Sequence, residues 1–374
     1  MKRIGILGGT FDPVHSEHVR LAKSAIEELG LDKLLVMPTC ISPHKSVLPS
    51  SADDRLNMLK IAFQGVDKVE ISDYEIKKEG KSYTYITVEH FKESFDGELF
   101  FIVGGDMLND FKNWKFPERI LNACTLAVFS REDYFTDYDK QEKYFEQNFN
   151  KKFVKLNYVG KTESSTRIRV FSSFGLSVEG MTEKGVAEYI KNNEMYRGDV
   201  YTEFVKSVLP EKRLVHTANV VVTAGKKSRP LGLDSEKVRI ASTLHDCAKY
   251  MDHNKVEGFS LPEGVPQPVI HAFLGAYVAE KFLKITDQEI LDAIRYHTSG
   301  KADMSLLGKV IFVADMVEDT RDYQGVEYLR ELYAQEDFER CFRECLREEF
   351  IHLTNKKQYI YAETLNAVAY YLKN

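Results

Sequence analysis

The sequence predicts an α/β domain, with a parallel sheet covered by helices on both faces, followed by an all-α domain. Three observations lead to this. The chain has 374 residues, which is enough for two domains of common size. Up to residue 193, short apolar runs alternate with amphipathic stretches, as in crossover units of a parallel sheet. Beyond residue 197 the strand signals stop and only helical patterns follow.

Six short apolar runs are expected to form the strands of the first domain: residues 4–7, 34–37, 69–71, 99–103, 126–129 and 153–159. Helical patterns lie between and after them, at residues 16–29, 53–63, 84–95, 162–169 and 182–193. In sheets of this kind, ligands bind at the carboxyl ends of the strands. Four polar side chains fall there: His15, Lys45, Asp106 and Arg131.

Residues 3–18, RIGILGGTFDPVHSEH, have the pattern of a phosphate-binding segment. Gly8 and Gly9 allow a sharp turn and close approach to a ligand, and Pro13 stiffens the loop. Ser16 is expected to cap a helix that stops at Gly30. Backbone N–H groups and the helix dipole favour an anion at this point. His15 and His18 could donate to phosphate oxygens and stabilise charge during group transfer.

The domain boundary is expected near residue 197, because residues 192–199 are polar and end the first pattern. This gives domains at 1–197 and 198–374. Helices of the second domain are expected at residues 201–209, 211–225, 235–250, 268–283, 287–296, 304–317, 326–354 and 362–372.

A second chemical site is indicated by His216, the adjacent pair His245-Asp246, and Asp315. Histidine and aspartate ligands together suit a borderline divalent ion such as iron, manganese or zinc. Such an ion lowers the pKa of bound water, which favours hydrolysis. A His-Asp dipeptide also occurs by chance in many proteins, so the pair alone is weak evidence.

Composition excludes several classes of protein. The net charge of −6 does not suggest a nucleic-acid partner. Five scattered cysteines without a C-x-x-C pattern fit reduced thiols in a cytoplasm. The start of the chain has no signal-peptide pattern, and no apolar run is long enough to cross a membrane. The oligomeric state stays open, and a homo-oligomer is one alternative.

The histidine motif, together with residues 164–169 (SSTRIR), resembles the HxGH nucleotidyltransferase superfamily, which has a Rossmann-like fold. Ser82-Tyr83-Thr84, Gly105-Asp106 and Trp114 make the first domain similar to bacterial nicotinate-mononucleotide adenylyltransferases. The resemblance implies transfer of an adenylyl group from ATP to nicotinate mononucleotide, which gives deamido-NAD and pyrophosphate. No protein nucleophile is needed, so positioning and charge stabilisation carry this reaction. Mg²⁺ would bridge the triphosphate.

The same resemblance assigns roles to individual residues. His15, His18, Lys45 and Arg169 would act on the phosphates during transfer. Thr84 and Trp114 would hold the pyridine nucleotide, although Trp114 could equally be core and Asp106 a helix cap. The expected substrate-binding residues are Gly8, Gly9, Thr10, Phe11, Thr84, Asp106, Trp114, Arg131, Ser165 and Thr166.

Two positions depart from the family pattern. Glu17 stands where the family usually has glycine, which affects close backbone approach. Glu163 stands where isoleucine usually precedes Ser-Ser-Thr. Neither change removes a phosphate donor. Acceptors other than nicotinate mononucleotide, such as nicotinamide mononucleotide or phosphopantetheine, stay open as alternatives.

The second domain resembles the HD-domain phosphohydrolases, and more closely the bacterial YqeK family, which cleaves diadenosine tetraphosphate symmetrically into two ADP. The resemblance implies His216, His245, Asp246 and Asp315 as ligands of a metal, typically iron. It implies contacts to phosphate or ADP from Arg213, Lys249, His271, His297 and Arg321. Alternatives are a nucleotide sensor that regulates the first domain, and a hydrolase for guanosine tetraphosphate or a nucleoside monophosphate.

Overall fold

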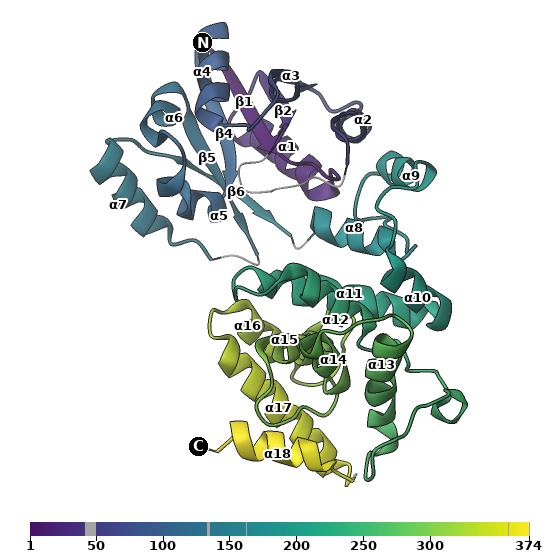
Figure 1. Ribbon diagram of the computed structural model, residues 1–374. Helices are drawn as coiled ribbons and strands as arrows, with labels where there is room; N and C mark the ends of the chain where they lie inside the picture. Colours follow the sequence, from purple (N-terminus) through teal and green to yellow (C-terminus); the bar gives the residue numbers. More distant parts are fainter. Residues whose placement is uncertain (42–49, 133–134, 162, 358, 374) are drawn as a thin grey trace. The chain divides into compact units, whose positions relative to one another are not determined.

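The computed structural model describes residues 1–41, 50–132, 135–161, 163–357 and 359–373 (Figure 1). The chain forms two compact units. Unit 1 comprises Met1–Arg169 and Val178–Tyr196, and unit 2 comprises Val170–Ser177 and Arg197–Asn374. The sequence places the boundary between the two functional domains near residue 197, and this boundary stays a prediction.

Unit 1 is built on one six-stranded parallel sheet with the order β3-β2-β1-β4-β5-β6. All six expected strands are present: β1 (Lys2–Gly9), β2 (Lys33–Pro38), β3 (Val69–Ile71), β4 (Gly97–Gly104), β5 (Thr125–Arg131) and β6 (Val154–Gly160). The order reverses between β1 and β4, and ligands of doubly wound sheets bind beyond the carboxyl ends of the strands at such a reversal. The loops after β1 and β4 therefore define where a site is expected.

Helices cover both faces of this sheet, as predicted. On one face, Ile6, Phe101 and Val128 pack with α4 (Thr84–Ser94), α6 (Pro117–Ala123) and α7 (Tyr138–Phe149). On the other, α1 (Ser16–Glu28) contacts β1, β2 and β6, and α2 (Ala52–Ala62) contacts β2 and β3. Successive strand residues point to opposite faces, which explains why the strands read as continuous apolar runs.

Several elements of unit 1 differ from the sequence expectation. Ser16 is not the cap of α1, because the N-cap residue is His15, and the Ser16 hydroxyl instead donates to the carbonyl oxygen of Met181 at 2.7 Å. Helices that the pattern did not predict are the short α3 (Tyr74–Lys78) and α5 (Gly105–Asn109), and also α6 and α7. The helix expected from residue 162 begins as α8 (Ser165–Ser173), and the one from 182 as α9 (Lys184–Asn192).

Unit 2 is all-helical among the residues that the structure describes. Its centre is α15 (Leu306–Val317), which is apolar on nearly all sides and packs against five other helices. The others are α10 (Val200–Val208), α11 (Glu211–Ser228), α12 (Ser235–Leu244), α13 (Ile270–Lys281), α14 (Gln288–Arg295), α16 (Val326–Ala334), α17 (Phe338–Asn355) and α18 (Ala362–Tyr371), with the 3₁₀ turns η2 (His253–Lys255) and η3 (Gln267–Val269).

Two predicted helices of unit 2 were wrong in extent. The helix expected over residues 235–250 ends at Leu244, and the chain then turns through bonds between residues three apart, such as Cys247 N–H to the Leu244 carbonyl. The single helix expected over residues 326–354 is two helices. It breaks before α17, where the Asp337 side chain accepts a bond from the backbone N–H of Arg340 at 3.0 Å.

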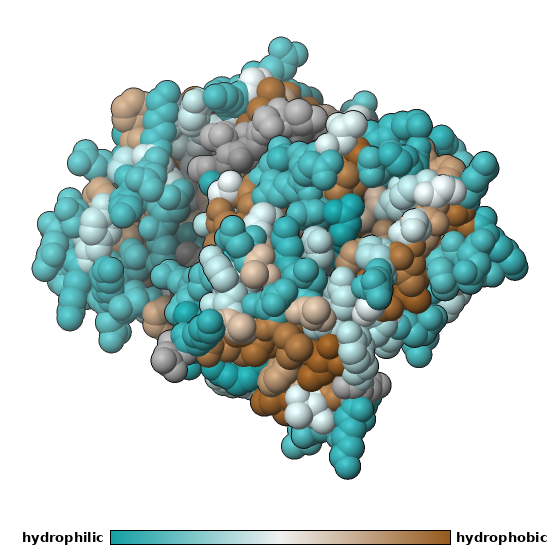
Figure 2. Space-filling model, turned by 60° about the horizontal axis from the view of Figure 1, so that its bottom comes forward, coloured by the Kyte–Doolittle hydropathy of each residue, from teal (hydrophilic) through white to brown (hydrophobic). Residues whose placement is uncertain are grey.

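Figure 2 shows one face on which hydrophilic residues predominate and hydrophobic residues gather in separate patches. Within the described part of the chain, none of the helices combines the length and the apolar character that a membrane span requires.

Candidate functional site

The histidine pair of unit 1 lies where β1 passes into α1. His15 is the N-cap residue of α1 and His18 lies one turn further on, so their rings stack with centroids 3.6 Å apart. The backbone N–H of His15 donates to Nδ1 of His18 at 3.2 Å. A neutral His18 then carries its proton on Nε2, which leaves this N–H available to a ligand.

Both imidazoles are held in the neutral form. Burial lowers the pKa of His15 to about 4, with Glu17 opposing this shift and Arg131 adding to it. Burial also holds the pKa of His18 well below its ordinary value, and His15 and Arg131 lower it further. The pair therefore offers N–H donors rather than positive charges, and Arg131 lies close enough to act on both.

The loop after β1 is shaped by the ring of Phe11. Phe11 is buried, has a positive φ of 50°, and packs its edge against His18 at a centroid distance of 4.9 Å. A Cβ atom on Gly9 would lie only 3.0 Å from the Phe11 ring, so a side chain there would push the ring away. A side chain at position 9 would therefore need the Phe11 ring to shift, and Phe11 in turn packs against His18.

The predicted phosphate-binding residues of α8 attach to the same loop. Ser165 Oγ donates to the Pro13 carbonyl oxygen at 2.8 Å, and Arg169 donates to the Asp12 carbonyl oxygen at 2.6 Å. Arg169 also donates to Thr166 Oγ1 at 3.2 Å. The structure therefore brings the motif at residues 164–169 next to the histidine motif, although the two lie about 150 residues apart in sequence.

Three residues that the sequence analysis missed support this loop. Arg55, which is 1% exposed, donates to the carbonyl oxygens of Thr10 (3.0 Å) and Thr39 (2.7 Å), and so ties the loop after β1 to the end of β2. The buried carboxylate of Asp12 accepts from the Tyr196 hydroxyl at 2.7 Å. An arginine on the buried face of an amphipathic helix was the available signal for Arg55. Nothing in the local sequence pointed to Tyr196.

Glu17, the departure from the family pattern, is buried at the start of α1. Its carboxylate accepts from the Tyr158 hydroxyl at 2.6 Å and from the Lys161 backbone N–H at 2.9 Å, and it pairs with Arg20. Burial opposes its ionisation, but these partners outweigh burial and lower its pKa. Glu17 thereby joins α1 to the end of β6.

The remaining predicted residues of unit 1 are spread around the sheet. Thr84 is the first residue of α4, Asp106 lies in α5 directly after β4, and Trp114 packs against Phe101 and Phe111. Gly8 and Gly9 are the last two residues of β1, so the chain turns only after them and not at the two glycines as expected. Lys45 lies outside the described residues. Ligand contacts of these side chains stay predictions.

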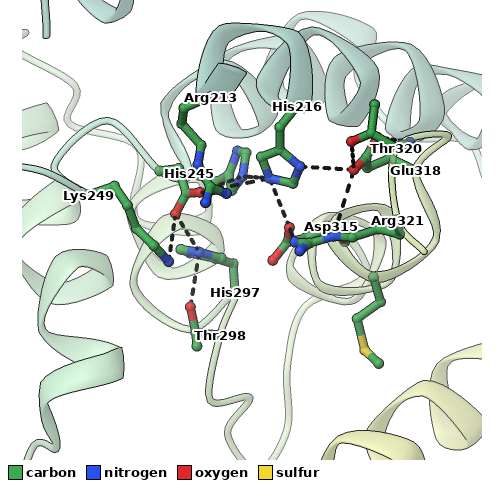
Figure 3. A network of polar contacts seen from close by, with 12 residues as sticks. Arg213, His216, His245, Lys249, His297, Thr298, Asp315, Glu318, Thr320 and Arg321 are labelled. Atoms are coloured by element: carbon green, nitrogen blue, oxygen red, sulfur yellow. Dashed lines mark hydrogen bonds and ion pairs between the residues drawn. The ribbon is translucent and has the colours of Figure 1, made fainter. Parts of the chain in front are cut away.

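The four predicted metal ligands of unit 2 converge from three segments. Figure 3 labels three of them, His216, His245 and Asp315. His216 comes from α11, His245 and Asp246 from the turn after α12, and Asp315 from α15. Nε2 of His216 lies 3.3 Å from Nε2 of His245, 3.1 Å from Asp315 Oδ1 and 3.8 Å from Asp246 Oδ2. His216, His245 and Asp246 can each bring one ligand atom within 4.8 Å of the others.

The positions of the protons on His216 and His245 explain why these ligands suit a divalent cation. Nδ1 of His245 lies 2.7 Å from the Ser242 carbonyl oxygen, and Nδ1 of His216 lies 3.0 Å from the Glu318 carboxylate. Since oxygen acceptors fix the protons on both Nδ1 atoms, the two Nε2 lone pairs face each other. A cation, or a proton on His216, must separate them.

The same electrostatics appear in the pKa shifts of the cluster. Burial opposes a charge on His216, but Asp315 and Glu318 outweigh it and raise the pKa of this histidine. Burial lowers the pKa of His245 to about 3. Burial opposes ionisation of Asp246 and Asp315, yet the neighbouring histidines and Arg321 hold both pKa values well below the ordinary range. Both carboxylates are therefore ionised and ready to bind a cation.

A second group of side chains surrounds the other oxygen of Asp246. Oδ1 lies 3.0 Å from His271 Nε2, 3.5 Å from His297 Nε2 and 3.5 Å from Lys249 Nζ. The Thr298 hydroxyl lies 3.0 Å from His297 Nε2. Asp246, His271 and His297 form another set that could hold an ion. Asp246 thus joins the four predicted ligands to the residues predicted to contact phosphate.

The two arginines each pair with a predicted ligand. Arg213 donates to Asp246 Oδ2 at 2.8 Å, and Arg321 pairs with the carboxylate of Asp315. The structure therefore places every predicted residue of the second site in one cluster. It also adds Glu318, which is fully buried and accepts from the backbone N–H (2.7 Å) and hydroxyl (2.6 Å) of Thr320. A carboxylate one helical turn beyond Asp315 was the signal that could have found it.

Comparisons with known proteins find separate matches for the two halves of the chain. Residues 6–171 match the cytidylyltransferase-like family model. A probable nicotinate-nucleotide adenylyltransferase of Clostridium tetani is 38% identical over 200 residues, which cover 53% of this chain and 100% of the relative. The chain belongs to the nicotinate-nucleotide adenylyltransferase family. The resemblance drawn from the histidine and SSTRIR motifs is thereby confirmed.

The second half of this member of the adenylyltransferase family matches the HD domain model over residues 213–319. A probable nicotinate-nucleotide adenylyltransferase/Ap4A hydrolase of Mycoplasma genitalium is 28% identical over 331 residues, covering 86% of this chain and 88% of the relative. A crystal structure described as a predicted HD superfamily hydrolase involved in NAD metabolism, from Clostridium acetobutylicum, is 30% identical. It covers 46% of this chain and 95% of that one, with a TM-score of 0.42. The expected order of domains, an adenylyltransferase domain followed by an HD domain, is confirmed.

Proposed function

We propose that unit 1 transfers the adenylyl group of ATP to nicotinate mononucleotide, which gives deamido-NAD and pyrophosphate. One observation carries this proposal. Ser165 and Arg169 bond to the loop that precedes His15 and His18, and this loop follows β1, where the strand order reverses. The names of the Clostridium and Mycoplasma relatives support the choice of substrates.

The side chains of unit 1 act in this reaction by holding the phosphates. His18 Nε2–H donates to a phosphate oxygen of ATP, and neutral His15 lies beside it within the same turn. Arg169 and Ser165 hold the β- and γ-phosphates at the start of α8. The acceptor phosphate then attacks the α-phosphorus in line, and pyrophosphate leaves. When bound with ATP, Mg²⁺ neutralises charge on the triphosphate.

An acceptor panel tests this proposal. Purified protein is incubated with ATP, Mg²⁺ and each of nicotinate mononucleotide, nicotinamide mononucleotide and phosphopantetheine, and released pyrophosphate is measured. We expect the highest kcat/KM with nicotinate mononucleotide and a loss of at least 100-fold in His18→Ala. A higher kcat/KM with another acceptor would replace the assigned substrate.

For unit 2, we propose metal-dependent hydrolysis of diadenosine tetraphosphate to two ADP. The cluster of His216, His245, Asp246 and Asp315 carries this proposal, since two imidazole lone pairs and two ionised carboxylates meet there. Iron or another divalent transition metal suits these ligands, and when bound it lowers the pKa of a coordinated water. The printed name of the Mycoplasma relative supports the substrate.

The cationic side chains around this cluster hold the polyphosphate. Lys249 lies 3.1 Å from His271, and Arg213 and Arg321 border the carboxylates, so positive groups surround the place where phosphate oxygens would lie. Water adds to one of the two central phosphorus atoms, the bridging P–O bond breaks, and ADP leaves with charge that these groups stabilise. The products are then two molecules of ADP.

Chromatography of the products tests the second activity. The protein is incubated with diadenosine tetraphosphate and Mn²⁺ or anaerobic Fe²⁺, with His245→Ala alongside. We expect ADP alone, lost in the variant and lost after chelation of the metal. AMP together with ATP would show that a different bond is cut. Metal binding without turnover would favour a nucleotide sensor instead.

A further inference from the structure

Tyr196, the last residue of unit 1, bonds to the loop that lies between β1 and the histidine pair. Its hydroxyl donates to Oδ1 of Asp12 at 2.7 Å and accepts from the Ser50 hydroxyl at 2.9 Å. Because Ser50 already supplies a proton to the phenol oxygen, the phenol proton points to Asp12. Burial and the negative charge of Asp12 raise the pKa of Tyr196, so the phenol keeps this proton at neutral pH.

The carboxylate of Asp12 depends on this donor. Asp12 is 2% exposed, and its Oδ2 atom has no hydrogen-bond partner among the residues that the structure describes. A buried carboxylate without a donor is costly, because water cannot replace the missing bond. If the Tyr196 hydroxyl were removed, the carboxylate would therefore turn to a positive charge nearby.

Arg169 is the cation that bonds to Asp12 itself. Its guanidinium donates to the Asp12 carbonyl oxygen at 2.6 Å. Burial lowers the pKa of Arg169, while the charges of Asp12 and Tyr196 oppose this shift, so both groups lie within electrostatic reach. Arg55 also feels the charge of Asp12, but its guanidinium is occupied by two carbonyl oxygens of the neighbouring loops.

The Asp12 carboxylate and a phosphate group are alternative partners for Arg169. Both are anions that a guanidinium can bind with two parallel N–H groups. Arg169 is proposed above to hold the β- and γ-phosphates of ATP. A carboxylate that is already bonded to Tyr196 competes less for this arginine, which leaves the guanidinium to the phosphates.

The backbone of Tyr196 is held in an uncommon conformation. Its φ is 56°, in the left-handed region that tyrosine rarely adopts. Such a conformation persists only where the surrounding structure holds it. The preceding helix, α9, packs against α2, and the Tyr189 hydroxyl donates to Asp54 of α2 at 2.9 Å (Figure 1). The packing of α9 and the turn after it thus bring Tyr196 to Asp12.

We propose that Tyr196 is a positioning residue for adenylyl transfer, which holds the Asp12 carboxylate and thereby keeps Arg169 available to the phosphates of ATP. The proposal rests on the proposed function of unit 1. Tyr196 lies outside every motif of the sequence analysis, and it acts on ATP through Asp12 and Arg169 rather than by contact. We expect an effect on ATP and not on the acceptor, because this series of contacts ends at the triphosphate.

Kinetics of full-length variants test the role of Tyr196. The formation of deamido-NAD is measured with Mg²⁺ at varied ATP and at varied nicotinate mononucleotide. We expect Tyr196→Phe to lower kcat/KM for ATP roughly tenfold, because a bond to a charged group is lost and the guanidinium is diverted. KM for nicotinate mononucleotide should stay unchanged.

Tyr189→Phe is the matched control, because the Tyr189 hydroxyl also donates to an aspartate, and Tyr189 lies in the helix that precedes Tyr196. Its kcat/KM for ATP should equal that of the parent protein, whereas a purely structural role of Tyr196 would make the two variants alike. The double variant Asp12→Asn/Tyr196→Phe should recover most of the lost kcat/KM, because a neutral amide does not compete for Arg169.

A second measurement does not depend on the acceptor. Binding of α,β-methylene-ATP, which cannot release pyrophosphate, is titrated by hydrogen exchange in peptides of residues 8–20. We expect roughly tenfold weaker binding in Tyr196→Phe than in Tyr189→Phe. Protection in the parent protein without formation of deamido-NAD would overturn the assigned reaction, while the titration would still decide the role of Tyr196.

Three results would overturn the role of Tyr196. The first is equal affinity for the ATP analogue in the two tyrosine variants. The second is a rise in KM for nicotinate mononucleotide as large as the rise for ATP. The third is a double variant that is no more active than Tyr196→Phe, because the Asp12 charge would then not be the cause of the loss.

Discussion

Some side chains of the second site are fixed by partners on more than one of their polar atoms. His216 is an example: Nδ1 faces Glu318 at 3.0 Å, while Nε2 faces His245 and Asp315. Glu318 is held by Thr320, and a carboxylate behind a metal-binding histidine orients the ring and raises its basicity. Removing the charge of Glu318 should therefore weaken metal binding, although Glu318 is not itself one of the four predicted ligands.

We expect Glu318→Gln to weaken the affinity of unit 2 for Mn²⁺ by about 10- to 100-fold, because the amide loses the charge that fixes the proton on Nδ1 of His216. Competition with a chelating dye measures this. Glu327→Gln is the control, since its side chain is 77% exposed and pairs only with Arg330 among the described contacts. Equal Mn²⁺ affinity in the two variants would contradict the role of Glu318.

Glu17 departs from the family pattern, and the contacts of its side chain explain how the fold accommodates it. Its buried carboxylate receives bonds from Tyr158 and the Lys161 N–H, so α1 is attached to the end of β6. We expect Glu17→Gln to destabilise unit 1 by about 1–3 kcal/mol, because charge-assisted bonds are lost in a buried place. Urea unfolding monitored by hydrogen exchange at residues 158–161 measures this.

Glu27→Gln is the matched control for Glu17, because Glu27 is an exposed residue of the same helix. Its stability should stay within about 0.5 kcal/mol of the parent protein. If Glu17→Gln unfolds at the same urea concentration as Glu27→Gln, the contacts of Glu17 do not stabilise the junction of α1 and β6.

At the scale of elements, the break between α16 and α17 decides where α17 lies. The apolar periodicity of residues 326–354 continues across the break, which is why a single helix was expected. The side chain of Asp337 accepts from Arg340 N–H and starts a new helix, whose buried side contains Phe338, Cys341 and Phe342. A helix cap therefore overrides a continuous apolar pattern.

We expect Asp337→Ala to destabilise unit 2 by about 1 kcal/mol, because the first turn of α17 loses its capping acceptor. Thermal unfolding followed by circular dichroism measures the change. Glu336→Ala is the control, since Glu336 is the exposed neighbour and does not cap the helix. A change in melting temperature of equal size in both variants would argue against capping as the cause.

At the scale of the whole molecule, acid pH should destabilise unit 1 through its buried histidines. The pKa of His15 is about 4 in the folded protein and about 6.5 when unfolded. Below pH 6.5 the unfolded chain binds a proton that the folded chain does not, so stability falls from pH 6.5 to about 4. The contribution of His15 is on the order of 3 kcal/mol. Buried Glu75, whose pKa is raised, changes stability in the opposite direction.

Calorimetry between pH 7.5 and 4.5 measures this effect, and comparison with His15→Gln isolates the histidine. We expect the melting temperature of unit 1 to fall more steeply with acid in the parent protein than in the variant. Parallel curves would show that His15 does not carry the acid sensitivity. The stabilisation from the lowered pKa values of Asp246 and Asp315 is lost mainly below about pH 4, where the unfolded carboxyl groups bind protons, so these residues contribute little in this window.

The sequence by itself determined the local features. The six strands lie where the apolar runs predicted, because strands buried on both faces leave a continuous apolar signal. The two-domain organisation followed from the loss of strand signals after residue 197, and the family from motifs with several residues in fixed order. The end of α12 and the short helices α3 and α5 were not predicted, because a few residues carry too little periodicity.

Only the tertiary structure decided which distant residues meet. Arg55, Tyr196 and Glu318 are single polar residues, and their roles arise from contacts with segments far away in the chain. Burial then gives these contacts their strength, since a polar group removed from water must find a partner within the protein. Composition and spacing carry information about neighbours along the chain, whereas the partners of a buried polar group are set by how the helices and strands pack.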